Sequence, residues 1–322
     1  MPEITSKLKS ATHTTDISLS SIKITLELRA LTAISLPPYK GSALRGGFGH
    51  AFRKVVCAVR KNDCTDCLLK HRCAYSYVFE TPPPPDTTML RKYPRAPHPF
   101  VIEPPDEDKG IYEPGETLTF SLVLIGRGRE YLPYFVYAFE ELGKMGIGKG
   151  KGRYVVEEIR DGNDVIYTAE SKRLNSPNSP IALPLEIDDV HRLSLSFITP
   201  ARIKFDEQIT TDPEFHILIR NLLRRISSLS YFHEGIKMEL DYQGIIDRSM
   251  AVKTTRKDIT WNDWERYSSR QDARMNLGGF VGKLEFAGEL GEFMPFLRLG
   301  ELVHIGKATS FGLGKYKIET GG

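Results

Sequence analysis

One ending occurs twice in this chain, once in each half: a predicted helix, then a glycine-rich loop, then a strand. The first copy reads Gly146-Ile-Gly-Lys-Gly-Lys-Gly-Arg-Tyr154 and the second Gly306-Lys-Ala-Thr-Ser-Phe-Gly-Leu-Gly-Lys-Tyr316. Internal similarity of this kind indicates a supersecondary unit that is present twice. A length of 322 residues suits two domains at about 150 residues each.

The elements before each ending also follow one order. Residues 21–30 alternate strictly, which predicts a half-buried antiparallel strand with Ile22, Ile24, Leu26 and Leu28 on its apolar face. The rest of the first half predicts a helix over about 43–57 started by Ser42, strands at 75–80 and 117–125, a helix at 131–142 and a strand at 154–159.

In the second half we expect a strand at 191–198, then a helix that Asp212 caps, with Pro213 in its first turn, running to about residue 232. Strands within 274–286, a helix at 293–303 and a strand at 315–318 complete it. Each half therefore reads β-α-β-β-α-β, the order of a ferredoxin-like domain. We predict an α+β fold of tandem ferredoxin-like domains with glycine-rich loops.

This interpretation divides the chain as follows: a polar tail at 1–18, a first domain at 19–160, a linker at 161–186 and a second domain at 187–322. The first domain contains a cysteine-bearing insertion at 57–73 and a proline-rich loop at 81–110. Nine of the 20 prolines fall between Pro82 and Pro105. Proline lacks a backbone donor and fixes φ, so this stretch is expected to be extended loop outside the core.

Composition excludes several classes of protein. At 40% hydrophobic, 26% charged and 10% aromatic residues, the chain is neither disordered, nor a coiled coil, nor collagen-like. No apolar run approaches the roughly 18 residues of a membrane span, and Met1 to Ser10 lacks the apolar core of a signal peptide. We therefore expect a cytoplasmic protein with no membrane partner.

The net charge of +3 is too small to indicate nucleic-acid binding, but the basic residues are concentrated. Between Lys40 and Arg72 there are eight basic residues against Asp63 and Asp66, and Lys144 to Arg153 holds four with no acid. Such clusters attract a polyanion even when the total charge nearly cancels. Ordinary solvated basic faces are the alternative.

The glycine loops match neither common nucleotide fingerprint. Lys315 is followed by Tyr316 rather than Ser or Thr, and both loops precede a strand instead of opening a helix. Exposed glycine backbone flanked by cations can follow a phosphodiester chain closely, which favours nucleic-acid contact. The alternative is a turn that simply requires positive φ. The flanking cations are Lys144, Lys149, Lys151, Arg153, Lys307 and Lys315.

All four cysteines lie within one short segment, at Cys57, Cys64, Cys67 and Cys73. The C-x6-C-x2-C-x5-C spacing is typical of a tetrahedral Zn²⁺ site, and disulfides are disfavoured in a cytosolic chain. We predict a structural Zn²⁺ and no catalytic metal, because four protein ligands leave no open position. An iron–sulfur cluster and reduced thiols without metal are the alternatives.

Two of the eight histidines lie in basic, glycine-rich surroundings. His50 follows Gly46, Gly47 and Gly49 within the first helix, and His304 immediately precedes the second glycine loop. For a single histidine a structural role is the more common one. These two are nevertheless the candidates for proton transfer.

Five segments resemble the repeat-associated (RAMP) CRISPR proteins, and in particular the sixth CRISPR-associated family, in a cysteine-containing branch. They are the glycine–arginine run Gly41–His50, Thr199-Pro-Ala-Arg202, Arg266-Tyr-Ser-Ser-Arg-Gln271, Leu277-Gly-Gly-Phe-Val-Gly282 and His304–Tyr316. Pro97-His-Pro-Phe100 and 126–134 also fit that branch, and the likeness extends over most of residues 20–320.

The resemblance implies tandem RRM-like domains and metal-independent cleavage of precursor CRISPR RNA within its repeats. The ribose 2′-OH attacks the adjacent phosphate, which leaves a 2′,3′-cyclic phosphate (or 3′-phosphate) and a 5′-OH. An intramolecular nucleophile is already in position, so the needs are a base, an acid and cations around the phosphorane. The alternative is a non-catalytic RNA-binding RAMP subunit of an effector complex, and a metal-dependent or nucleotide-using enzyme comes third.

The family's Tyr–His–Lys set around the first helix corresponds to Tyr39, His50 and Lys54, here at compressed spacing, and His304 is the rival base. The expected partners are CRISPR repeat RNA or mature crRNA and effector-complex subunits, with the chain a monomer or homodimer. The residues expected to bind RNA are Arg45, Arg53, Lys149, Lys151, Arg153, Arg266, Arg270, Lys307 and Lys315.

Overall fold

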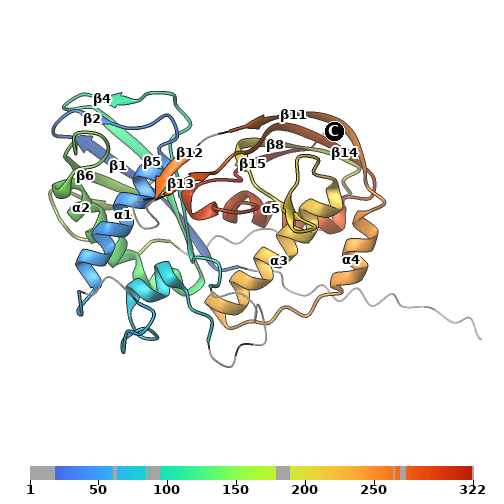
Figure 1. Cartoon of the computed structure of the whole chain (residues 1–322), viewed down its shortest axis with the longest axis horizontal. Helices are drawn as coiled ribbons and strands as arrows, with labels where there is room; N and C mark the ends of the chain where they lie inside the picture. Colours follow the sequence, from blue (N-terminus) through green and yellow to red (C-terminus); the bar gives the residue numbers. More distant parts are fainter. Residues whose placement is uncertain are drawn as a thin grey trace, which may run out of the picture.

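The computed structural model of the chain shows two α+β lobes side by side, coloured blue to green and yellow to red in Figure 1. It describes residues 19–60, 64–84, 87, 95–178, 189–263, 265–268 and 273–320. Within that part of the chain no helix is long and apolar enough to cross a membrane.

The first domain is built on a five-stranded antiparallel sheet of order β3-β5-β1-β6-β7. Its elements, in chain order, are β1 (Ser21–Ala30), β2 (Ile34–Ser35), α1 (Gly41–Val56), the π-helix η1 (Ser76–Glu80), β3 (Phe100–Glu103), β4 (Ile111–Tyr112), β5 (Thr117–Ile125), η2 (Gly126–Tyr131), α2 (Leu132–Met145), β6 (Tyr154–Asp161) and β7 (Asp164–Thr168).

The second domain is built on a four-stranded antiparallel sheet of order β11-β14-β8-β15. Its elements are β8 (Arg192–Ala201), β9 (Lys204–Phe205), β10 (Gln208–Ile209), α3 (Phe215–Glu234), α4 (Tyr242–Ser249), β11 (Lys253–Asn262), β12 (Glu265–Ser268), β13 (Ala273–Asn276), β14 (Gly279–Ala287), η3 (Gly291–Phe293), α5 (Met294–Val303), η4 (Thr309–Phe311) and β15 (Tyr316–Thr320).

Both domains have the same topology. Numbered within each β-α-β-β-α-β unit, the four main strands lie in the order 2-3-1-4 in both sheets. That arrangement is ferredoxin-like, so the predicted tandem fold is confirmed. The extra pieces are short insertions and one added edge strand, β7.

The predicted apolar faces form the cores. Ile22, Ile24, Leu26 and Leu28 of β1 are all buried, and Phe48 of α1 stacks on Phe135 and Phe139 of α2 with ring centroids 4.8 and 4.7 Å apart. The two cores also meet, because Val101, Val123 and Ile125 of the first domain belong to the buried cluster of the second. The two domains therefore pack against each other through a shared hydrophobic core.

Several local predictions were wrong. Residues 76–80 form a π-helix instead of a strand, and α1 begins at Gly41 without a cap from Ser42, whose hydroxyl donates to the Tyr39 carbonyl. Helix α3 begins at Phe215, after Asp212. A short apolar run such as 75–80 does not distinguish a buried strand from a buried helical segment, and cap residues do not fix the exact helix start.

Two predicted loops contain strands. The proline-rich stretch holds β3, whose four residues are all buried, because prolines flank the strand without interrupting it. The predicted linker holds β7, which pairs with β6, and its residues 179–188 lie outside the described part. Strand β11 was also missed, because it is an exposed edge strand with a mostly polar sequence.

Candidate functional site

The outer face of α1 carries His50. Its side chain is exposed, and Gly46, one turn earlier on the same face, has open space where a Cβ would lie. Gly47 instead meets Leu142 of α2, so that glycine serves close helix packing. The glycine-rich start of the helix thus leaves the surface beside His50 accessible to a ligand.

Cations flank His50 on this face. Lys54 lies one turn further along and its ammonium contacts Glu141 Oε2 of α2 at 3.3 Å. The Arg53 guanidinium lies over the Tyr75 ring, 5.1 Å from its centroid. Both side chains are held at the helix surface, where they can contribute positive charge next to the imidazole.

Tyr39 is not part of this surface. Its hydroxyl donates to the Phe311 carbonyl of the second domain at 2.8 Å, and burial, reinforced by Asp106 and Glu103, raises its pKa well above the usual value. Since a helix rises about 1.5 Å per residue, His50 lies roughly 14 Å beyond the start of α1. The structure therefore does not bring Tyr39, His50 and Lys54 together, and Tyr39 acts at the domain interface.

The second glycine loop differs from the exposed edge that its sequence suggests. Residues 309–314 are buried, and the backbones of the two domains touch there. A Cβ on Gly41 would lie 2.1 Å from the Phe311 carbonyl oxygen, and one on Gly312 would lie 2.6 Å from that of Ile102. These glycines allow the loop backbone to pack directly against the backbones of α1 and β3.

His304 lies at the start of this loop and is fully buried. Its Nδ1 lies 3.2 Å from the Leu313 carbonyl, and its Nε2 lies 3.5 Å from Glu103 Oε1 of the first domain. Burial lowers the pKa of His304, and Glu103 opposes this shift. Its φ of 62° is a strained value for a residue with a side chain. A residue held in this way has no access to RNA, so the expectation of His304 as a catalytic base conflicts with the structure.

Glu103 is the centre of a buried ion cluster that sequence reasoning missed. Besides His304, its carboxylate contacts Lys23 at 3.0 Å and Lys315 at 3.3 Å. Burial raises the pKa of Glu103, but its contacts with His304, Lys23 and Lys315 hold that pKa well below the usual range. Lys315 also contacts Asp106, so the Lys315 ammonium is paired with two carboxylates of the protein. Its predicted role in RNA binding is therefore not supported.

The remaining residues that were predicted to bind RNA differ in how exposed their side chains are. Lys149, Lys151 and Arg153 of the first glycine loop, and Lys307 of the second, are exposed. Arg45 lies between the Phe79 and Phe311 rings, 4.8 Å from each centroid, and approaches His98 Nε2 at 3.4 Å. Arg45 therefore joins the domains rather than facing solvent. Arg270 lies outside the described residues, as does the side chain of Arg266.

Two further histidines lie between the domains: His233 is buried and His98 is half-buried. His98 contacts Thr81 Oγ1 at 3.1 Å, and His233 of α3 contacts Tyr77 Oη at 2.9 Å and the Pro97 carbonyl at 2.8 Å. Sequence reasoning predicted no role for either. The one signal in the sequence is the Pro97-His-Pro-Phe100 segment, whose partner residues are remote in the chain.

All four cysteines line one small pocket together with Tyr75 and Ser76. None forms a disulfide, and Cys64 and Cys73 pack against the first core. Burial raises the pKa of Cys64, and both Cys57 and Cys73 are close enough to add to the shift. Among the described residues, no three Cys, His, Asp or Glu side chains converge tightly enough to hold a metal as they stand.

Both halves of the chain match known protein families. Residues 195–316 match the family model of the CRISPR-associated endoribonuclease Cas6, and residues 19–179, half of the chain, match that of the AF_1859_N N-terminal domain. An uncharacterized protein of Archaeoglobus fulgidus is 25% identical over 293 residues, which are 88% of this chain and 93% of the relative.

Solved Cas6 structures share the fold. A Cas6 product complex aligns with a TM-score of 0.57 at 14% identity, covering 93% of this chain and 100% of that one. Thermus thermophilus Cas6 aligns at 0.53 and 12% identity, with 94% and 99% coverage. A chain of a partial Cas6-RT-Cas1–Cas2 complex aligns at 0.56 and 12% identity over 94% of this chain and 46% of that one.

The chain thus shares the tandem ferredoxin-like fold of the solved Cas6 structures. Its first half belongs to the AF_1859_N N-terminal domain family. Residues 195–316, in the second domain, are similar to the CRISPR-associated endoribonuclease Cas6 family.

Proposed function

We propose that this protein cleaves the repeats of precursor CRISPR RNA by attack of a ribose 2′-OH on the adjacent phosphate, without a catalytic metal. The match of residues 195–316 to the Cas6 endoribonuclease family supports the substrate class. The observation that carries the site assignment is the contrast between the two candidate bases: His50 is exposed on α1 beside the open surface at Gly46, whereas His304 is buried.

In this proposal His50 takes the proton of the 2′-OH as the new P–O bond forms. Arg53 and Lys54 place positive charge beside the phosphate, where the phosphorane gains negative charge, and the leaving 5′-oxygen takes up a proton from solvent water. Holding the ribose and phosphate against the helix surface supplies the remaining advantage, because the nucleophile is intramolecular. The products are a 2′,3′-cyclic phosphate and a 5′-OH.

A single nucleotide substitution tests this chemistry. Repeat RNA incubated with the protein in EDTA should be cut, and a 2′-deoxy substitution immediately 5′ of the cleaved bond should abolish cutting while leaving binding nearly intact. Cleavage of the deoxy substrate would instead establish attack by water. Tight binding of the unmodified repeat without any cutting would favour the non-catalytic RNA-binding subunit.

We also propose that the four cysteines hold a structural Zn²⁺. The donor set suits it, since four thiolates form a closed tetrahedral site, and all four thiols already line one pocket. Binding requires the side chains to turn inward, because they do not converge as they stand. The metal would join Cys57 at the end of α1 to Cys73 before η1 and so stabilise the insertion.

A further inference from the structure

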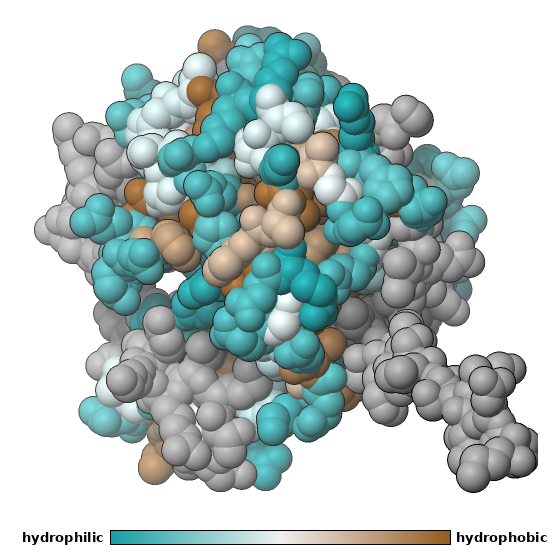
Figure 2. All heavy atoms as spheres, turned by 90° about the vertical axis from the view of Figure 1, so that its right-hand side faces the viewer, coloured by the Kyte–Doolittle hydropathy of each residue, from teal (hydrophilic) through white to brown (hydrophobic). Residues whose placement is uncertain are grey.

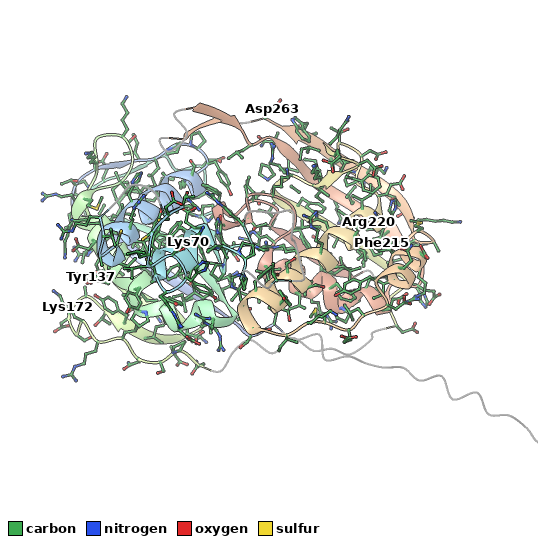
Figure 3. The ribbon with its side chains drawn as sticks, turned by 60° about the horizontal axis from the view of Figure 1, so that its bottom comes forward. Lys70, Tyr137, Lys172, Phe215, Arg220 and Asp263 are labelled. Atoms are coloured by element: carbon green, nitrogen blue, oxygen red, sulfur yellow. The ribbon has the colours of Figure 1, made fainter. Side chains whose placement is uncertain are left out.

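A group of cations on the second domain lies apart from α1 and has no role in the chemistry proposed above. We call it the α3 cation cluster: Lys204, Arg220, Arg224 and Lys307. Arg220 and Arg224 are exposed four residues apart on α3, so they share one face of that helix. Figure 3 shows Arg220 on the second domain, at the opposite end of the molecule from Lys172 and Tyr137.

The second glycine loop brings Lys307 to this helix. The Gly306 amide donates to Asn221 Oδ1 of α3 at 3.0 Å, and the Lys307 amide donates to the Arg202 carbonyl at 2.9 Å. Asn221 lies between the two arginines in the sequence of α3. The loop is therefore fixed to the helix at the position of the cluster, with the Lys307 side chain exposed.

The β9–β10 hairpin completes the cluster. It carries Lys204 next to Phe205, whose ring lies 5.6 Å from the Arg220 guanidinium and 5.7 Å from the His216 ring. A guanidinium over an aromatic face is oriented without being neutralised. The hairpin thus contributes one cation and a platform for a second.

The carboxylate of Glu207 shows how close these charges are. Its hydrogen bond to Lys204 lowers its pKa, and the charges of Lys307 and Arg224 lower it further. Glu207 is almost fully exposed and pairs with Lys204, and Asp206 beside it is exposed as well. The four cations of the cluster therefore lie beside these two acids, and one of the acids, Glu207, is paired with Lys204. Figure 2 shows this end of the molecule, where many hydrophilic side chains surround a smaller apolar strip.

We propose that the α3 cation cluster binds the phosphate backbone of the RNA at nucleotides away from the cleaved bond. This proposal rests on the proposed function for the identity of the polyanion. Exposed Arg and Lys around a backbone-lined loop suit phosphates, which supply most of the affinity for nucleic acid. A protein interface would instead bury aromatic and apolar groups at its centre. Phe311 of the same loop accepts a hydrogen bond from Tyr39, just before α1, so the loop connects the cluster to the helix that carries His50.

The test measures binding of the uncleavable 2′-deoxy repeat as a function of salt. We expect Arg220→Ala with Lys307→Ala to weaken affinity by about tenfold. The slope of log K against log salt should fall by about 0.7–0.9 for each phosphate that the double variant no longer neutralises. Lys172→Ala, a cation exposed at the far end, is the matched control and should change neither quantity. Melting curves of all variants verify folding.

An unchanged salt slope in the double variant would overturn the proposal. Loss of binding to another protein, with RNA binding unaltered, would overturn it in favour of a protein interface. If the native protein binds but does not cut the repeat, and the double variant still has a reduced slope, the nuclease proposal fails while the cluster's assignment stands.

Discussion

His50 and His304 occur in similar basic, glycine-rich sequence, and the fold gives them opposite surroundings. His50 lies on the outer face of a helix, whereas His304 is sealed between two domains with its ring nitrogens facing the Leu313 carbonyl and Glu103. Only an accessible imidazole can exchange a proton with RNA. This difference assigns separate tasks to the two residues.

Replacing His50 with alanine tests the catalytic task. We expect His50→Ala to reduce single-turnover cleavage by about 10²–10⁴-fold, the usual contribution of a general acid or base, with little loss of RNA affinity. The side chain is exposed, so its removal should leave the melting temperature nearly unchanged. Rapid-quench cleavage and equilibrium binding measure the two effects separately.

His304→Ala is the paired variant. It removes a buried ring that contacts Glu103 across the interface, so we expect a lower melting temperature and a normal cleavage rate for the folded fraction. The assignment is wrong if His304→Ala loses the rate at full stability while His50→Ala keeps it. The active site would then belong to the second domain.

At the scale of elements, the cysteine insertion has little structure of its own. Apart from the short turns that place Cys67 and Cys73, no regular element lies between Cys57 and η1 within the described residues. A segment without a core of its own is typically stabilised by a metal or a crosslink. The zinc proposal follows from this need as well as from the thiol spacing.

We expect one Zn²⁺ per chain by elemental analysis, and its loss when Cys64 and Cys67 are both changed to serine. The double variant should melt at a lower temperature and bind RNA more weakly, because the insertion adjoins Tyr75, which supports Arg53. Asp66→Asn, between the same two cysteines, keeps the four thiols and serves as the control. Iron with visible absorbance would overturn the assignment.

At the scale of the whole molecule, buried histidines at the domain interface make stability depend on pH. Burial lowers the pKa of His233 to about 4, and it also lowers the pKa values of His98 and His304. Above pH about 6.5 these groups are neutral in both folded and unfolded chains. Below pH about 6.5 the histidines of the unfolded chain are protonated, whereas those of the folded chain stay neutral until the pH falls to their lowered pKa values.

Stability should therefore fall between pH 6.5 and pH 4, and His233 alone should contribute a loss of about 3 kcal/mol. Urea unfolding at pH 7, 5.5 and 4.5 measures this loss. His233→Gln removes the titrating group but keeps hydrogen-bonding capacity toward Tyr77 and Pro97, so its stability should depend less on pH. Equal slopes for the native protein and the variant would contradict this account.

The sequence by itself determined the fold class, since alternation in β1 and the repeated element order are local patterns set by the periodicity of strands and helices, but it did not locate the second strand of either sheet, β3 or β11. It also placed His50 within the first helix, and the structure shows that its side chain is exposed there. Only the tertiary structure decided the surroundings of Tyr39, His304 and Lys315. Their partners Phe311, Glu103 and Asp106 lie in the opposite domain. No local pattern encodes such contacts, because burial and ion pairing across an interface depend on residues far apart in the chain.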